Sequence, residues 1–260
     1  MPRVVLGVAY LGGAFEGWQT QPHGRTVQDH LLHCLERING EPLQLFCAGR
    51  TDTGVHARRQ VVHFDTNACR PASAWTKGVN QFLPDDISVT GAVEKDDSFH
   101  ARFSAVSRTY RYYFYCASAR DPFKQTMTWV HYPLDLDAMQ KAAEVFVGTH
   151  DFSAIRAAQC QAKSPVRTIY SIRLVQNSDH AYFEIHGNAF LHHMIRNLMG
   201  VLFEVGLGRK PLDWAQQVLD SRRRENASRT YPAQGLVLWN VKYPDEFQVD
   251  QLFQTSFQWA

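Results

Sequence analysis

The stretch CAGRTDTGVH (residues 47–56) concentrates groups that can do acid–base or nucleophilic chemistry. It holds one carboxylate, Asp52, close to Arg50 and His56, and two further arginines follow just after it. Cationic neighbours favour the ionised form of a carboxylate, and an oriented, ionised carboxylate can act as a nucleophile or a base. In a turn, however, an aspartate more often caps backbone N–H groups beside a glycine such as Gly54. The residue types alone leave both roles open for Asp52.

Two other kinds of catalytic site are poorly supported. The tripeptide DTG at 52–54 matches the D-[TS]-G pattern of aspartic proteases, but their chemistry needs two carboxylates that share one proton, and the sequence has no second copy. The 12 histidines form no H-E-x-x-H and no cysteine–histidine cluster at ligand spacing. His192 and His193 are adjacent and would point to different sides of a helix. We therefore expect a single activated aspartate and no metal.

Regular elements on both sides must position this loop. The apolar stretches LQLFCA and QVVHFD predict strands before and after it, and RVVLGVAY predicts a first strand. TVQDHLLHCLERI predicts a helix with Thr26 and Asp29 in capping-box positions. Further elements are expected as a short helix near 74–79, strands at 87–93 and 108–116, a helix at 134–148, a hairpin at 167–188, an apolar helix at 191–206, a short helix from Pro211 and a strand at 235–243. This mixed order predicts two α+β halves with a boundary in 121–132.

The composition is that of an ordinary globular chain, with 45% hydrophobic and 20% charged residues. MPRVVLGVAYLGGAF does not read as a targeting signal, because its apolar residues alternate and run into a polar segment. No apolar run approaches the roughly 20 residues that cross a bilayer. Five widely spaced cysteines without a C-x-x-C pair suit reduced thiols. We therefore expect a cytoplasmic protein that does not bind membranes.

Positive charge is unevenly distributed on a chain whose formal net charge is only +2. Between His100 and Arg120 the sequence has arginines and no acid at all. A second cluster consists of Arg222, Arg223, Arg224 and Arg229. Locally basic surfaces of this kind are compatible with a polyanionic partner without proving one.

Several longer motifs resemble the tRNA pseudouridine synthase A family. G-R-T-D-x-G-V-H followed by Q-V-V-H-F resembles its catalytic motif, and YLGGAFEGWQTQPHGRTVQDHLLHCL resembles its N-terminal stretch. FHARFSAVSRTYRY, HDFSAIR, NAFLHHMIRNLMG and GLVLWNVKYP match further segments in the same order. The resemblance runs from about Val4 to Pro244, which is nearly the whole chain.

The resemblance implies an isomerase that converts uridine to pseudouridine at nucleotides 38, 39 and 40 of the tRNA anticodon stem-loop. Asp52 matches the catalytic aspartate, Tyr110 the tyrosine that stacks on the target base, and Arg196 the arginine that pairs with the catalytic carboxylate. Arg50, in the same motif, is expected to bind the substrate. The residues alone favour a core position for Tyr110 and a solvent-facing one for Arg196, although a charge on this apolar helix is awkward to bury unpaired.

The implied architecture is an α+β (α/β) pseudouridine synthase fold of two similar halves. Their mixed or antiparallel sheets are expected to flank a central active-site cleft. The N-terminal half, 1–125, would carry the catalytic loop, and the C-terminal half, 126–260, would complete the cleft. The resemblance also implies a homodimer that works without a cofactor.

The reaction is consistent with this absence of cofactors, because it breaks a C–N bond and rejoins the base through carbon without oxidation or group transfer. Asp52 can add to C1′ of the sugar, add to C6 of the ring, or take the C2′ proton, and the sequence leaves all three open. His56 is expected to orient the loop. The family more often has alanine where this chain has Thr53, which puts the loop's geometry or substrate tolerance in question.

The partner implied is tRNA. Phosphate contacts are expected from the following arginines, each of which also reads individually as an ordinary surface charge: Arg58, Arg59, Arg102, Arg108 and Arg111. Two alternatives remain open, namely a catalytically inactive RNA-binding α/β protein and an aspartate-dependent hydrolase.

Overall fold

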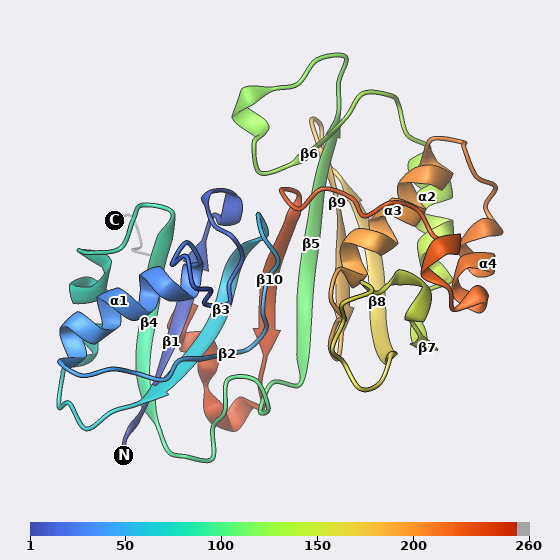
Figure 1. The fold of residues 1–260 in the computed structure, drawn as a ribbon. Helices are drawn as coiled ribbons and strands as arrows, with labels where there is room; N and C mark the ends of the chain where they lie inside the picture. The colour runs from blue at the N-terminus through green and yellow to red at the C-terminus, as the bar shows by residue number, and fades with distance from the viewer. Residues whose placement is uncertain (254–260) are drawn as a thin grey trace. The chain divides into compact units, whose positions relative to one another are not determined.

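The computed structural model describes residues 1–253, and the chain divides into two compact units (Figure 1). The first unit comprises Met1–Val106 and the described part of Leu238–Ala260, and the second comprises Ser107–Val237. These units differ from the expected halves, 1–125 and 126–260, in two ways. The boundary follows Val106, and a C-terminal segment belongs to the first unit. The aromatic strand β5 (Ser107–Cys116) falls in the second unit because it pairs with β9 (Ala181–Gly187). The last strand returns to the first unit, so that unit is not one continuous segment.

The first unit is built on a mostly antiparallel sheet that carries the loop of Asp52 between two of its strands. Its strands, in spatial order, are β4 (Ile87–Lys95), β1 (Arg3–Tyr10), β3 (His56–Asp65) and β10 (Leu236–Lys242), with the short β2 (Phe46–Cys47) against β3. The strand β1 is buried almost throughout because it lies between β3 and β4. The predicted strands at 60–65 and 87–93 are confirmed, whereas LQLFCA forms a strand only at its centre.

Helix α1 (Val27–Asn39) begins where the sequence predicts. The Thr26 hydroxyl accepts a hydrogen bond from the Asp29 N–H, and the Asp29 carboxylate accepts one from the Thr26 N–H, so the capping box is complete. The helix ends at Gly40, whose φ of 88° only glycine adopts readily. Its apolar face, with Leu31 and Leu35, is fully buried.

The second unit is built on a sheet with β5 next to β9, followed by β8 (Val166–Gln176) and β7 (Gly148–Asp151); β6 (Thr128–Val130) pairs in parallel with β5. Its helices are α2 (Leu136–Glu144), α3 (Met194–Gly206) and α4 (Trp214–Ser221). Phe203 of α3 packs edge-on against Phe114 of β5, with ring centroids 5.1 Å apart. The predicted hairpin is therefore confirmed as β8 and β9, and α3 packs on the strand that carries Tyr110.

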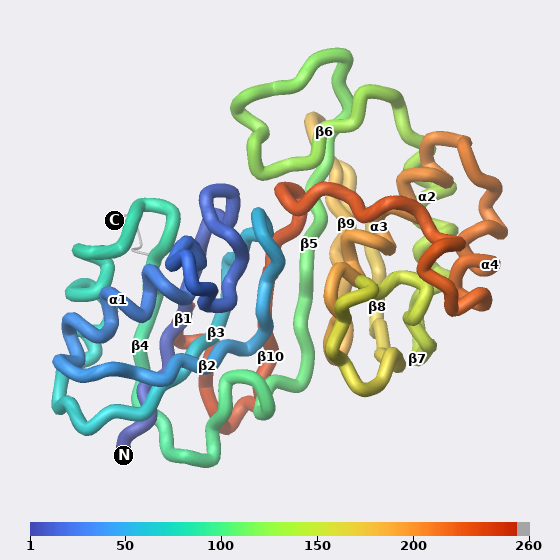
Figure 2. The backbone as a smooth tube through the Cα atoms, in the orientation of Figure 1, coloured from blue at the N-terminus to red at the C-terminus, as the bar shows by residue number. Residues whose placement is uncertain are grey.

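Short helical turns connect these elements, and Figure 2 follows the backbone through them. They are η1 (Gly12–Ala14), η2 (Ala74–Gly78), η3 (Pro122–Lys124), η4 (Ser153–Ile155), η5 (Arg224–Asn226), η6 (Asp245–Phe247) and η7 (Val249–Phe253). Within residues 1–253, no helix combines the length and apolarity needed to span a membrane.

Two helix expectations need correction. The helix expected over 134–148 ends at Glu144, and Gly148, with φ 113°, opens β7 rather than stopping the helix. The helix expected over 191–206 begins only at Met194, because His193 has left-handed backbone angles (φ 59°). The rings of His192 and His193 consequently lie side by side, with centroids 4.1 Å apart, instead of on different sides of a helix.

Candidate active site

The loop that carries Asp52 connects β2 to β3 and is fixed by hydrogen bonds on both sides of the aspartate. The Trp18 N–H donates to the Thr51 carbonyl at 3.0 Å, and the hydroxyls of Tyr10 and Thr51 are 2.8 Å apart. The Val55 N–H donates to the carbonyl of Asp52 itself at 3.1 Å. Asp52 is half-buried on this fixed backbone, so its carboxylate is held in a defined place near the surface.

Two glycines of the stretch GGAFEGW let another backbone segment approach the loop. A Cβ on Gly12 would lie 2.0 Å from the Val55 carbonyl oxygen, a distance that no side chain can occupy. Gly17 has φ 84°, and a Cβ there would meet the backbone of Thr53 at 3.2 Å. The sequence shows these glycines, but it does not show that they touch residues some 40 positions away.

His56 opens β3 and is 4% exposed. Its Nδ1 accepts a hydrogen bond from the Gly12 N–H at 2.9 Å, so this nitrogen carries no proton. The imidazole thereby joins the start of β3 to the segment that packs on the loop. This contact agrees with the expectation that His56 orients the loop.

Tyr110 lies in the second unit, at the centre of β5 opposite Ile185 of β9. The residue is 8% exposed, and its ring meets the ring of Phe190 edge to face, with centroids 5.2 Å apart. Its position among core side chains matches what the residues alone predict.

Arg196 is half-buried near the start of α3, and its guanidinium is oriented by one residue of a distant loop. Its Nε donates to the carbonyl of Tyr231 at 2.8 Å, and the Tyr231 N–H donates back to the Arg196 carbonyl at 3.2 Å. The Tyr231 ring in turn stacks on Phe203, with centroids 4.3 Å apart and planes 3° from parallel. Arg196 is thus a bound side chain rather than the solvent-facing one that its residue type suggests.

The same loop is tied to α3 by a buried amide that sequence reasoning missed. Asn197 is fully buried and donates from Nδ2 to the Ile155 carbonyl at 2.9 Å. Its Oδ1 accepts from the Thr230 hydroxyl at 2.6 Å and from Arg224 at 3.1 Å. A polar residue inside the mostly apolar stretch 191–206 is the signal that could have found this contact.

The arginines expected to contact RNA differ in their surroundings. Arg58 is exposed, and its guanidinium lies 4.2 Å from the ring centroid of Trp239. Arg108 donates to the Asn188 carbonyl at 3.0 Å. These two contacts have an aromatic ring and a neutral carbonyl oxygen as partners.

Two others have carboxylate partners. Arg111 forms two 2.7 Å contacts with Glu184, which is its cross-strand neighbour in β9. Arg59 contacts Asp250 at 3.4 Å and lies over the ring of Phe253 at 5.0 Å. A guanidinium that already faces a carboxylate has less to gain from a phosphate.

The sequence-predicted site residues therefore fall into two groups. The first unit carries Arg50 and Asp52 on one loop, and the second unit carries Tyr110 on a strand and Arg196 on a helix. Arg50 is exposed and separated from Asp52 by one residue.

A family model and curated relatives both match this chain. Residues 7–104 and 142–244 match the family model described as tRNA pseudouridine synthase; Asp52 and Arg196 lie inside these ranges and Tyr110 outside them. The tRNA pseudouridine synthase A of Paraburkholderia phytofirmans is 51% identical and covers 100% of this chain and 96% of that protein. That of Paraburkholderia xenovorans is 50% identical and covers 100% and 97%.

Among solved structures, the one titled "Crystal structure of the archaeal box H/ACA sRNP Nop10-Cbf5 complex" is 12% identical, covers 85% of this chain and 59% of that chain, and has a TM-score of 0.37. The assignment rests on the family model and the curated relatives instead. Both extend over most of the chain and include the G-R-T-D loop. The chain belongs to the tRNA pseudouridine synthase family.

Proposed function

We propose that this protein isomerises uridine to pseudouridine at positions 38, 39 and 40 in the anticodon stem-loop of tRNA, with Asp52 as the catalytic carboxylate. The observation that carries the proposal is the match of nearly the whole chain to tRNA pseudouridine synthases together with an Asp52 loop held in one conformation. A fixed loop is what catalysis requires, since the reacting carboxylate must be oriented before the substrate arrives.

The reaction asks little of the protein besides one carboxylate and a way to hold the base. The bond between N1 of uracil and C1′ breaks, the ring turns, and a bond between C5 and C1′ forms; C5 loses its proton and N1 takes up one from solvent. An ionised Asp52 can assist as a nucleophile at C1′ or C6 or as a base at C2′. Each of these roles ends with the carboxylate regenerated.

Arg196 and Tyr110 complete the proposed site. We assign Arg196 to an ion pair with Asp52 during catalysis, which the tethering of its guanidinium to Tyr231 supports by limiting its rotation. We assign Tyr110 to stacking on the target base, for which its ring offers a flat apolar face. Arg50 is proposed to bind the substrate beside Asp52.

The proposed phosphate contacts come from the arginines of both units: Arg58, Arg59, Arg102, Arg108 and Arg111. Arg59 and Arg111 already contact Asp250 and Glu184, so we expect each of them to contribute little to RNA affinity. We further propose a cytoplasmic homodimer, a state implied by the family resemblance and testable by sedimentation.

Release of tritium from tRNA labelled at uracil C5 tests the proposed function, because the C5 proton is lost only when the new carbon–carbon bond forms. Wild-type protein should release tritium from the anticodon stem-loop, and Asp52→Asn should abolish release while tRNA binding persists. Undiminished release by Asp52→Asn would remove Asp52 from catalysis. Binding without release by the wild type would favour the inactive RNA-binding alternative.

A further inference from the structure

Four aromatic rings of the first unit contact one another in a series that ends at the protein surface. Phe46 of β2 stacks on His63 of β3 with centroids 4.9 Å apart and planes 13° from parallel. His63 meets His100 at 4.6 Å, and His100 meets Phe103 at 4.4 Å. We call these four residues the ring column. Nothing in the proposed chemistry at Asp52 uses it.

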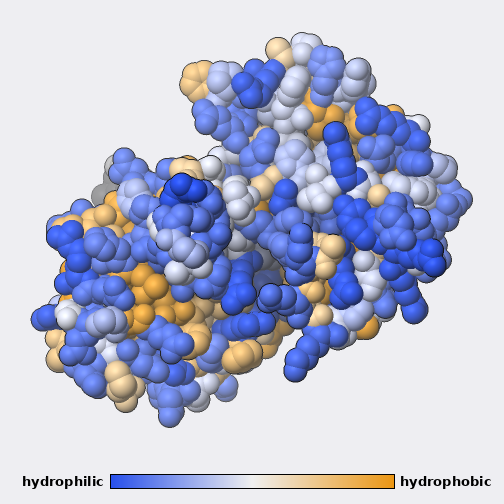
Figure 3. All heavy atoms as spheres, in the orientation of Figure 1, coloured by the Kyte–Doolittle hydropathy of each residue, from blue (hydrophilic) through white to orange (hydrophobic). Residues whose placement is uncertain are grey.

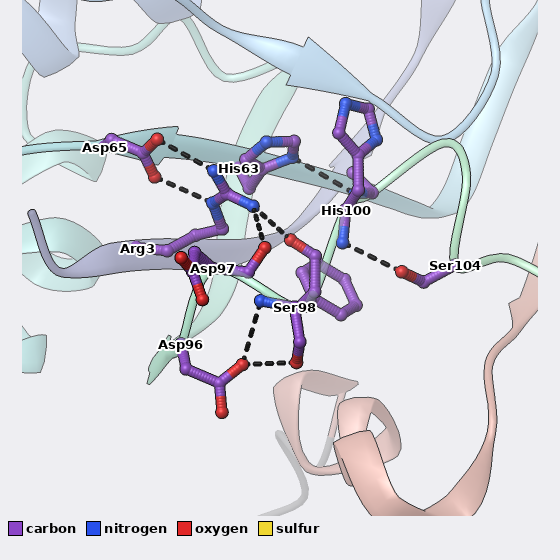
Figure 4. A network of polar contacts seen from close by, with 10 residues as sticks. Arg3, His63, Asp65, Asp96, Asp97, Ser98, His100 and Ser104 are labelled. Atoms are coloured by element: carbon purple, nitrogen blue, oxygen red, sulfur yellow. Dashed lines mark hydrogen bonds and ion pairs between the residues drawn. The ribbon is translucent and has the colours of Figure 1, made fainter.

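The segment that carries the outer half of the column is fixed to the sheet by Arg3, as Figure 4 shows. The Arg3 guanidinium binds both carboxylate oxygens of Asp65, at 2.7 and 2.8 Å. It also donates to the carbonyls of Asp97 at 3.0 Å and Phe99 at 2.5 Å. The largely buried guanidinium of Arg3 thus fixes the backbone just before His100.

Two further hydrogen bonds in Figure 4 fix the turn itself. The Ala101 N–H donates to Nδ1 of His63 at 3.1 Å, and the His100 N–H donates to the Ser104 hydroxyl at 2.9 Å. Phe103 therefore lies in a turn whose backbone is hydrogen-bonded at both His100 and Ala101. A rigid turn loses little conformational entropy when a ligand binds to it.

The two histidines act as neutral rings. His63 is 1% exposed, and burial, with the added effects of Arg3 and His100, lowers its pKa to about 4. Burial likewise lowers the pKa of His100. At neutral pH the column therefore consists of uncharged rings, and its exposed member, Phe103, can contact another flat aromatic group.

The outer end of the column is apolar but lies in a basic neighbourhood. Phe103 is 76% exposed, and the guanidinium of Arg102 lies 5.6 Å from its ring centroid. Figure 3 shows that apolar residues gather in patches on the surface among hydrophilic ones.

We propose that Phe103 stacks an unpaired nucleobase of the RNA substrate, with Arg102 binding an adjoining phosphate. A rigid exposed ring beside a guanidinium combines the two features by which proteins hold single-stranded nucleic acid, namely a stacking face and positive charge for the backbone. Phe103 is not among the residues assigned to the target uridine, which are Tyr110 and Asp52. The proposal rests on the proposed function, because it takes the partner to be tRNA.

Equilibrium binding of tRNA to the full-length Phe103→Leu protein tests the proposal. Leucine keeps an apolar side chain of similar bulk but offers no ring, so the Kd should rise about tenfold, in the range measured for losing one stacked base. Phe103→Tyr, which keeps the ring, should restore wild-type affinity. Arg102→Gln should reduce the slope of log Kd against log salt by about one.

The matched control is Phe82→Leu. Phe82 is also an exposed phenylalanine of the first unit, at 42%, and has the guanidinium of Arg37 3.9 Å from its ring centroid. It lies outside the ring column, so its replacement should leave the Kd unchanged. Equal effects of Phe82→Leu and Phe103→Leu would overturn the proposal, because the loss would then be nonspecific.

Anticodon stem-loops that each carry one abasic nucleotide identify the stacked base. At one unpaired position the tenfold effect of Phe103→Leu should vanish, since the abasic RNA has already lost the stack. A Phe103→Leu protein that binds every RNA like the wild type would contradict the inference while leaving the tritium-release test of Asp52 unaffected. Conversion of a dimer to a monomer by Phe103→Leu, seen by sedimentation, would assign the ring to a protein interface and overturn the proposal.

Discussion

Asp52 and Arg196 are held in place by different means. Asp52 lies on a loop whose backbone is fixed by hydrogen bonds from Trp18 and Val55 and by the close approach of Gly12. Arg196 lies on a regular helix, and only its side chain needs fixing, which the Tyr231 carbonyl does. The position of Asp52 therefore depends on glycines and backbone contacts, whereas the position of the Arg196 guanidinium depends on a side-chain hydrogen bond.

This difference predicts that substitutions near Arg196 change rate more than stability. Arg196→Lys keeps the charge but loses the Nε donor to Tyr231, so the cation is no longer oriented. We expect single-turnover tritium release to fall by about 100-fold, as for loss of a positioned catalytic group. The midpoint of thermal unfolding should change by only a few degrees. An Arg196→Lys enzyme as fast as the wild type would contradict the assigned role.

Near the Asp52 loop, by contrast, we expect a substitution to change stability, because one added methyl group would clash with the backbone. Gly12→Ala places a Cβ 2.0 Å from the Val55 carbonyl, so the loop must move. We expect a loss of about 2–4 kcal/mol in the free energy of unfolding, typical of severe overpacking. Gly13→Ala is the control, because nothing lies within 4 Å of that Cβ. Similar denaturant midpoints for the two variants would show that the close approach does not matter.

His63 should make the stability of the first unit depend on acidic pH. The pKa of His63 in the folded protein is about 4, below its unfolded value of 6.5. The unfolded chain therefore binds more protons between these values, and this stabilising contribution is complete above pH 6.5 and is lost as the pH falls to about 4. The loss amounts to at most about 3 kcal/mol. Urea unfolding across this range should show a smaller pH dependence in His63→Gln, and an unchanged dependence would exclude His63 as the cause.

The smallest effect is expected at His56, where only a hydrogen-bond acceptor is needed. His56→Leu leaves the buried Gly12 N–H without its partner, which costs about 1–3 kcal/mol. His56→Asn can supply a side-chain oxygen as acceptor and should retain more stability and most of the activity. Loss of activity in His56→Asn at full stability would instead indicate that the imidazole transfers a proton.

The sequence predicted best what depends on neighbours along the chain. The capping box of Thr26 and Asp29, the strand at β5 and the hairpin of β8 and β9 are all confirmed. Each is decided by periodicity or by residues three positions apart. The left-handed His193, by contrast, shifts the start of α3 in a way that no local propensity for histidine foretells.

Contacts between distant segments could not be predicted in the same way. Nothing local indicates that Gly12 meets Val55, that Arg196 bonds the carbonyl of Tyr231, or that β10 joins the first unit. Such contacts depend on how strands pair and loops close. The functional assignment was possible from the sequence because it rested on the ordered motifs, which do not require those contacts to be known.

Mapping of pseudouridine in tRNA from cells that lack this protein tests the central claim most directly. Uridines at positions 38, 39 and 40 should remain unmodified, while pseudouridines elsewhere in the same tRNAs stay. A plasmid carrying the wild-type gene should restore all three positions, and one carrying Asp52→Asn should restore none. Pseudouridine at these positions in the deletion strain, or its restoration by Asp52→Asn, would contradict the account.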